Sequence, residues 1–260
     1  MINTASSKSA KALLFRPLIS NEHGGTVTLA VCFLLGSWLA GSWNWTTSIA
    51  LVTVFAAFEV QVPLVRLVRR RQLDSRHSLW GMIYGSITIV GAGWLLWEHP
   101  ILIRVYAVGT VVLIAHLWGV FRRQRRNVVN ELGLFAGLCL ALPTAFVAAS
   151  GYMADYLLGL WLLSTAVFSQ SIFTVRIRLS GDAGIPGAVG HLISCYILVA
   201  GLIVARLLDA ELVWLLLIPT TKLLYILIRT DDYRQLRLAQ IGLLETGLAI
   251  LYAIGVIYYI

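Results

Sequence analysis

The feature that most constrains this chain is a succession of long apolar runs that continues to residue 259. Each run has about 18 to 22 residues, which is the length that a helix needs to cross the hydrocarbon core of a bilayer. Nine spans can be drawn, at residues 24–41, 45–65, 78–97, 101–121, 132–150, 156–175, 188–208, 211–228 and 240–259. Only 12% of the residues are charged, whereas a water-soluble domain has about a quarter. The sequence therefore predicts an all-α polytopic membrane protein, a bundle of about nine transmembrane helices.

The connections between these spans alternate in charge. Those after the first, third, fifth and seventh spans are short and nearly uncharged, whereas those after the second, fourth, sixth and eighth are basic. Of the 20 lysines and arginines, only Arg104 and Arg206 fall near the uncharged side. Because cytoplasmic loops carry such an excess, we expect a cytoplasmic N-terminus and a C-terminus on the opposite side of an inner or plasma membrane. The net charge of +8 is then a topology signal and an attraction to anionic lipid, and it does not indicate nucleic-acid binding.

The chain divides into two predicted parts. Residues 1–23 form a short polar and basic cytoplasmic tail, and residues 24–260 form a single transmembrane helical domain. The three cysteines, Cys32, Cys139 and Cys195, lie inside apolar runs without paired spacing, which favours buried thiols. No motif or clustered ligand set predicts a metal site.

Polar residues within the spans are costly in a bilayer and usually face a bundle interior or a cavity. Most of them here fall in the predicted cytoplasmic half, where we expect any chemistry or binding to occur. The candidate catalytic residues are Glu22, His23 and Glu59. The candidate substrate-binding residues are Arg66, Asn130, Glu131, Arg176, Arg178, Asp182, Lys222 and Glu245.

Helix capping is an alternative explanation for several of these residues. Glu22 before Gly24 suits a helix N-terminus, and Asn130 with Glu131 suits another, where the helix dipole favours both. Glu59 and Lys222 lie deeper in their spans, so they are the stronger candidates for a cavity.

Four stretches of the sequence resemble one family. The opening PLISNEHGGTVTL resembles the signature at the first span of the YwiC-like integral membrane proteins, and RRNVVNELGLFAGLCLALPTAF, SIFTVRIRL and RLAQIGLLETG resemble later blocks of that family. The resemblance covers nearly the whole chain. It implies an integral membrane protein but no particular activity.

A more distant resemblance is to the UbiA-type intramembrane prenyltransferases, which implies a UbiA-like architecture. Those enzymes hold Mg²⁺ through two aspartate-rich motifs, but the corresponding loops here contain FEVQVPLVRLVRRRQLD and RIRLSGDAG, without paired aspartates. The cofactor therefore stays open: Mg²⁺ is one candidate, but no aspartate-rich motif supports it. Arg66, Arg176 and Arg178 are instead candidates to grip a phosphate directly.

Three functional hypotheses remain open at this point. In the first, the protein binds an isoprenoid, quinone-type or other amphiphile at a cytoplasmic-side intramembrane site, as a binding protein or as a divergent prenyltransferase-like enzyme. In the second, it is an ion-coupled transporter whose path includes Glu59, Lys222 and Glu245. In the third, it is a non-catalytic scaffold that assembles with other membrane proteins. Membrane lipids are expected partners in all three.

Overall fold

A computed structural model describes residues 17–20, 23–70, 74–122 and 127–260, and in these ranges every regular element is a helix. The elements are α2 (His23–Leu39), α3 (Trp45–Arg70), α4 (Ser75–Glu98), η1 (Pro100–Leu102), α5 (Ile103–Phe121), α6 (Val128–Cys139), α7 (Ala141–Ser150), α8 (Tyr156–Ser180), η2 (Gly181–Gly184), α9 (Ile185–Val204), η3 (Ala210–Leu216), α10 (Leu217–Ile228), α11 (Thr230–Gln235) and α12 (Leu238–Tyr259).

The helices confirm an all-α polytopic membrane protein. Within the described ranges, seven segments are long and apolar enough to cross a membrane, and one of them, Tyr156–Val204, contains both α8 and α9, joined by η2. α2 is a shorter apolar helix of 17 residues. Each of the nine predicted spans thus coincides with an apolar helical segment. Many large apolar side chains point outward, which suits a lipid-facing surface.

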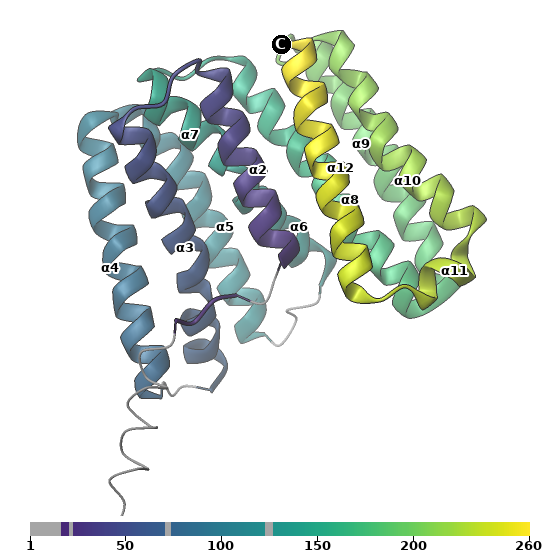
Figure 1. Ribbon diagram of the computed structural model, residues 1–260, viewed down its shortest axis with the longest axis horizontal. Coiled ribbons are helices and arrows are strands. Elements are labelled where there is room, and N and C mark those ends of the chain that lie inside the picture. Colours follow the sequence, from purple (N-terminus) through teal and green to yellow (C-terminus); the bar gives the residue numbers. More distant parts are fainter. Residues whose placement is uncertain (1–16, 21–22, 71–73, 123–126) are drawn as a thin grey trace, which may run out of the picture.

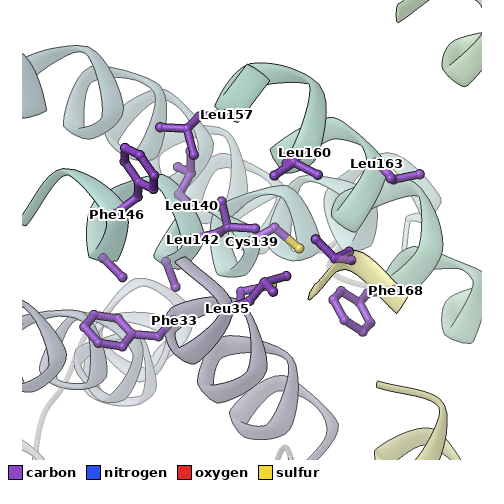
Figure 2. Packing of buried hydrophobic residues seen from close by; sticks show 14 of the residues in the cluster. Phe33, Leu35, Cys139, Leu140, Leu142, Phe146, Leu157, Leu160, Leu163 and Phe168 are labelled. Carbon is purple, nitrogen blue, oxygen red and sulfur yellow. The ribbon is translucent and has the colours of Figure 1, made fainter. Parts of the chain in front are cut away.

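The helices form two groups that meet at the middle of the bundle (Figure 1). α3, α4, α5, α6 and α7 lie with α2 on one side, and α8, α9, α10 and α11 lie with α12 on the other. α2 packs against both α7 and α12, so it links the two groups. The main core surrounds this junction, with Phe33 and Leu35 from α2, Leu142 and Phe146 from α7, and Leu160 from α8 (Figure 2).

A glycine permits the close approach of α2 to α7. A Cβ atom added to Gly36 in α2 would overlap the backbone carbonyl oxygen of Leu142 in α7. Small residues at helix crossings allow backbones to approach in membrane proteins, where van der Waals packing drives association. Gly36 therefore sets the distance between α2 and α7.

The span predicted at residues 132–150 is divided into α6 and α7 at Leu140. Pro143 lacks the N–H group that would continue the α-helical pattern to Cys139. At the same break, the Leu140 N–H donates to the carbonyl of Gly137, three residues back, at 3.2 Å. The break explains why one apolar run forms two short helices.

One end of the bundle gathers the basic residues. α3, α5, α8 and α10 end there, and α2, α4, α6, α9 and α12 begin there (Figure 1). We call this the basic end, because the described parts of the predicted basic connections lie at it. These carry Arg66, Arg69, Arg76, Arg122, Arg176, Arg178, Arg229, Arg234 and Arg237. Its assignment to the cytoplasm remains a prediction.

Candidate functional site

The predicted site residues do not meet in one cavity. Most of them lie toward the basic end, but they form separate pairs and networks on different helices. Glu22 lies outside the described residues, His23 is exposed at the start of α2, and Asp182 is exposed in η2.

Glu59 of α3 holds the segment that precedes α2. Its Oε2 accepts a hydrogen bond from the backbone N–H of Ser20 at 2.7 Å. On the neighbouring helix α4, the Tyr84 hydroxyl donates to the carbonyl of Leu18 at 3.0 Å. Residues 17–20 are therefore tied to the α3–α4 pair by side chains from both helices. Glu59 therefore anchors this segment, and its helix α3 lies in a different group of helices from α10, which carries Lys222 (Figure 1).

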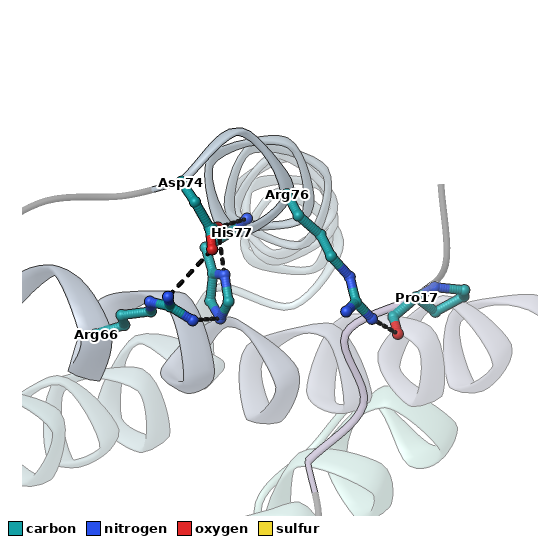
Figure 3. A network of polar contacts seen from close by, with 5 residues as sticks. All are labelled: Pro17, Arg66, Asp74, Arg76 and His77. Atoms are coloured by element: carbon teal, nitrogen blue, oxygen red, sulfur yellow. Dashed lines mark hydrogen bonds and ion pairs between the residues drawn. The ribbon is translucent and has the colours of Figure 1, made fainter. Parts of the chain in front are cut away.

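Arg66 belongs to a network at the start of α4 (Figure 3). Its Nη2 lies 3.1 Å from Asp74 Oδ2, and its Nη1 lies 2.8 Å from His77 Nε2. A guanidinium group can only donate, so Nε2 of His77 accepts and its Nδ1–H donates to Asp74 Oδ1 at 2.5 Å. Beside this network, Arg76 donates a separate hydrogen bond to the carbonyl of Pro17 at 3.0 Å (Figure 3).

Asp74 is also the N-cap of α4. Its Oδ1 accepts from the backbone N–H of His77 at 2.9 Å. This backbone hydrogen bond, together with the side chain of His77 and the nearby charge of Arg66, lowers the pKa of the Asp74 carboxyl, although partial burial opposes the shift. The contacts of Arg66 therefore join the end of α3 to the start of α4.

Two arginines at the end of α8 connect that helix to its neighbours. Arg176 Nη2 lies 3.0 Å from Glu131 Oε2 in α6, which pairs two of the predicted binding residues. Arg178 Nη2 donates to the carbonyl of Leu236 at 3.0 Å, just before α12. Both arginines therefore have protein acceptors within reach.

Lys222 and Glu245 form an ion pair between α10 and α12. The Lys222 side chain is only 4% exposed, and that of Glu245 is 23% exposed. Both lie within segments apolar and long enough to cross a membrane. Of the pairs formed by predicted site residues, this one is the most deeply buried. Lys222, Glu245 and Gln170 of α8 line one small cavity of about 20 Å³. The Oε1 atom of Gln170 is buried and has no hydrogen-bond partner among the described atoms.

A larger pocket lies between α5 and α6 near the basic end. Its volume is about 150 Å³. Two of its lining residues are hydrogen bonded to each other, with His116 Nδ1 at 3.2 Å from Asn130 Oδ1. The α5–α6 pocket is lined by Val112, Ala115, His116, Trp118, Gly119, Asn127, Val129, Asn130 and Gly133.

Glycine shapes this pocket as well. A Cβ atom on Gly119 would lie 3.1 Å from the carboxamide of Asn130, so Gly119 lets Asn130 approach α5 closely. Asn127 caps α6 by accepting from the backbone N–H of Val129 at 3.2 Å. The capping function that was an alternative for Asn130 thus belongs to Asn127, and Asn130 faces the pocket instead.

The sequence-based selection missed His77, His116 and Gln170. A lone histidine or glutamine in an apolar span is usually a satisfied interior residue, so nothing in the local sequence distinguished His116 or Gln170. The spacing of Asp74 and His77 is the one local signal for the α4 network, since a side chain at an N-cap reaches the backbone three residues on. In the described part of the chain, no three His, Cys, Asp or Glu side chains gather closely enough to hold a metal ion.

Comparison with known proteins supports the predicted family resemblance in one part of the chain. The family model of the YwiC-like proteins matches residues 19–146, which include α2 to α6 and part of α7. Neither the curated proteins nor the solved structures contain a match. The resemblance to the YwiC-like family is thus confirmed over the segment that contains the α5–α6 pocket.

Proposed function

We propose that this YwiC-like integral membrane protein binds an amphiphile whose head group is a single ring with oxygen substituents, such as a quinone or quinol. The observation that carries the proposal is the α5–α6 pocket, where His116 and Asn130 meet in an otherwise largely apolar wall. The proposal makes the first of the three hypotheses more specific and does not include a chemical reaction.

The size of the pocket favours one ring. Its volume is about 150 Å³, and an engineered cavity of about that size in another protein binds benzene. A six-membered ring therefore fits, whereas a phospholipid head group would need a larger space. Apolar walls with a few placed polar groups are typical of small-molecule sites.

The polar groups of the pocket suit oxygen substituents. A neutral imidazole offers one donor and one acceptor nitrogen, and a carboxamide offers both kinds of group. His116 is 3% exposed, so a hydrogen bond that it makes to a ligand is shielded from water. Trp118 adds an indole wall, and Arg122 lies over its ring with Cζ 5.0 Å from the centroid. An aromatic ligand can stack on such a wall.

The pocket is open toward the surface that lipid would cover. Its rim residues Ala115, Trp118 and Val129 are exposed, and Trp118 and Val129 are 58% and 74% exposed. His116 precedes the end of α5 by five residues, which corresponds to roughly 7 Å along the helix. A ring at this depth lies just inside the interface, so an attached hydrocarbon tail can remain in the lipid.

A prenyltransferase-like reaction would need additional groups. Arg176 contacts Glu131 and Arg178 contacts the carbonyl of Leu236, so these arginines would have to exchange partners before they gripped a phosphate. In the α5–α6 pocket, His116 and Asn130 are hydrogen bonded to each other at 3.2 Å, and the cavity that they line already has a volume of about 150 Å³. Binding of an uncharged ring is therefore the function that the geometry favours.

The test fills the pocket without displacing its walls. Gly133 lines the pocket, and a Cβ atom added there meets no atom within 4 Å. In Gly133→Leu, the new side chain should occupy the ligand's space. Gly93→Leu on α4 is the matched control, because a Cβ atom at Gly93 also meets nothing within 4 Å and this glycine lies outside the pocket.

The measurement is mass spectrometry of lipids that co-purify with each variant. We expect a quinone or phenol-type amphiphile with the wild type and with Gly93→Leu, and a loss of at least tenfold with Gly133→Leu. Equal recovery from Gly133→Leu, or no ring-bearing amphiphile from the wild type, would contradict the proposal.

A further inference from the structure

The C-terminal group of helices contains a second polar site, separate from the α5–α6 pocket. Lys222 of α10 projects into the apolar bundle and pairs with Glu245 of α12. Lys222 is 7% exposed as a residue, and apolar side chains such as Phe168, Ile218 and Leu248 surround the pair. A lysine ammonium in such surroundings requires an anionic partner, because an unpaired buried charge is unfavourable.

The two members of the pair differ in their freedom to move. The Glu245 side chain is 23% exposed, whereas that of Lys222 is 4% exposed. The Glu245 carboxyl group is therefore the less confined member of the pair. If it turns away from Lys222 within the cavity, an anion that takes its place satisfies the same ammonium group.

Gln170 offers an acceptor that the ionised pair does not use. Its side chain is 1% exposed, and its Oε1 has no hydrogen-bond partner among the described atoms. It lines the same cavity as Lys222 and Glu245, and that cavity of about 20 Å³ has room for roughly one water molecule. A carboxylate is an acceptor only, but a protonated carboxyl group gains one O–H donor. Protonation of Glu245 would therefore supply a donor in the cavity where Gln170 lacks one.

From these observations we propose that Lys222, Glu245 and Gln170 form a proton-linked binding site for a small monovalent anion. The anion replaces the Glu245 carboxylate beside Lys222, and Glu245 takes one proton from the aqueous phase. The site holds one positive and one negative charge before binding, and it holds the same two charges afterwards. No net charge is thus added to the membrane interior.

Among the titratable groups near Lys222, Glu245 is the one that we expect to take up the proton when the anion binds. Tyr233 of α11 interacts electrostatically with Glu245 and with Arg178, and Tyr252 of α12 is hydrogen bonded to Ser164 at 2.8 Å. The other titratable and charged groups on α12 and α10 are Tyr258, Tyr259 and Tyr225. On the elements packed around these two helices they are Tyr156, Arg176 and Arg178 on α8, His191, Cys195 and Tyr196 on α9, Asp231, Asp232 and Arg234 on α11, His23 and Cys32 on α2, and Glu211 on η3. Glu245 is the carboxyl group that lines the cavity with Lys222.

Chloride is the probe that fits the available space. The purified protein is placed in weakly buffered neutral solution with a pH indicator, and sodium gluconate is replaced by sodium chloride at constant ionic strength. Gluconate is too large for the cavity, so it serves as the reference anion. We expect the solution to become more alkaline as the wild type takes up about one proton for each chloride bound.

The variants separate the two parts of the linkage. Lys222→Gln should lose at least tenfold in chloride affinity and should take up no proton. Glu245→Gln should bind chloride without proton uptake, because the carboxamide has no proton to gain. The control is Arg229→Gln, which removes an exposed ion pair with Asp232 (3.5 Å) and should behave as the wild type.

Three results would overturn the proposal. The first is chloride binding to the wild type without proton uptake, and the second is absence of chloride binding to a folded wild type. The third is unchanged proton uptake in Glu245→Gln. Because Glu245→Gln is predicted to retain chloride binding, it also keeps the test decisive if Lys222→Gln does not fold. None of these results depends on the α5–α6 pocket.

Discussion

Replacement of Glu245 by glutamine should destabilise the protein by an amount set by the burial of Lys222. The substitution keeps the size of the side chain but leaves the ammonium group, 4% exposed, without its anion. Removal of one member of a buried ion pair typically costs about 3–5 kcal/mol. Replacement of both members by apolar residues of similar volume is often nearly neutral. We therefore expect Glu245→Gln to lose about 3 kcal/mol and Lys222→Met/Glu245→Leu to lose much less.

The buried thiols provide the assay. Cys32, Cys139 and Cys195 are free and buried, so a thiol-reactive fluorescent dye reports their exposure when the protein unfolds in detergent. The same unfolding curves recorded with chloride should show partial recovery of Glu245→Gln, because the anion occupies the vacated place beside Lys222. Arg229→Gln is the surface control and should change stability by less than about 1 kcal/mol.

Two results would refute this reasoning. A stability of Glu245→Gln equal to that of the wild type would show that Lys222 does not depend on its partner. A double variant as unstable as Glu245→Gln would show that the loss arises from packing and not from charge.

Two further predictions concern the fold. Gly36→Ala should destabilise the protein by about 1–3 kcal/mol, because its Cβ atom would overlap the Leu142 carbonyl oxygen. In the control Gly201→Ala the new Cβ atom meets no atom within 4 Å, so this variant should be neutral or slightly stabilising in the same thiol-dye assay. Equal effects of the two substitutions would contradict the close α2–α7 contact. Asp74→Asn should keep the N-cap of α4 but lose the charge. The lowered pKa of Asp74 means that its contribution is present above the ordinary pKa of the carboxyl and is lost as the pH falls through the folded value. Unfolding curves across acidic pH should therefore be flatter for Asp74→Asn, with a difference at neutral pH below about 1 kcal/mol because the group is half exposed. An acid limb as steep as that of the wild type would contradict this assignment.

The apolar runs were sufficient to predict the helical architecture, because span length is fixed by bilayer thickness. The division of one run into α6 and α7 depends on how Pro143 and the Leu140 hydrogen bonds are accommodated in three dimensions. The packing of α2 against both α7 and α12 depends on contacts between residues far apart in the chain. Neither feature has a periodic signal in the sequence.

The candidate site was predictable in its residue types but not in its grouping. Lys222 and Glu245 were selected because a charged side chain within a bilayer has a high free-energy cost, and the structure shows that they form an ion pair. The same criterion selected Asn130 but passed over His116, because a single histidine in an apolar span carries no local sign of its partner. Arg66 was selected for phosphate binding, and its neighbours Asp74 and His77 were recognisable as a network only once α3 and α4 were side by side.

The most direct test of the central claim is a structure of the protein in lipid nanodiscs with decylubiquinone. The account predicts ring density in the α5–α6 pocket, within hydrogen-bond distance of His116 or Asn130, with the tail leaving between Trp118 and Val129 toward lipid. Density for the ring at another site, with the α5–α6 pocket empty or filled by an acyl chain, would contradict it.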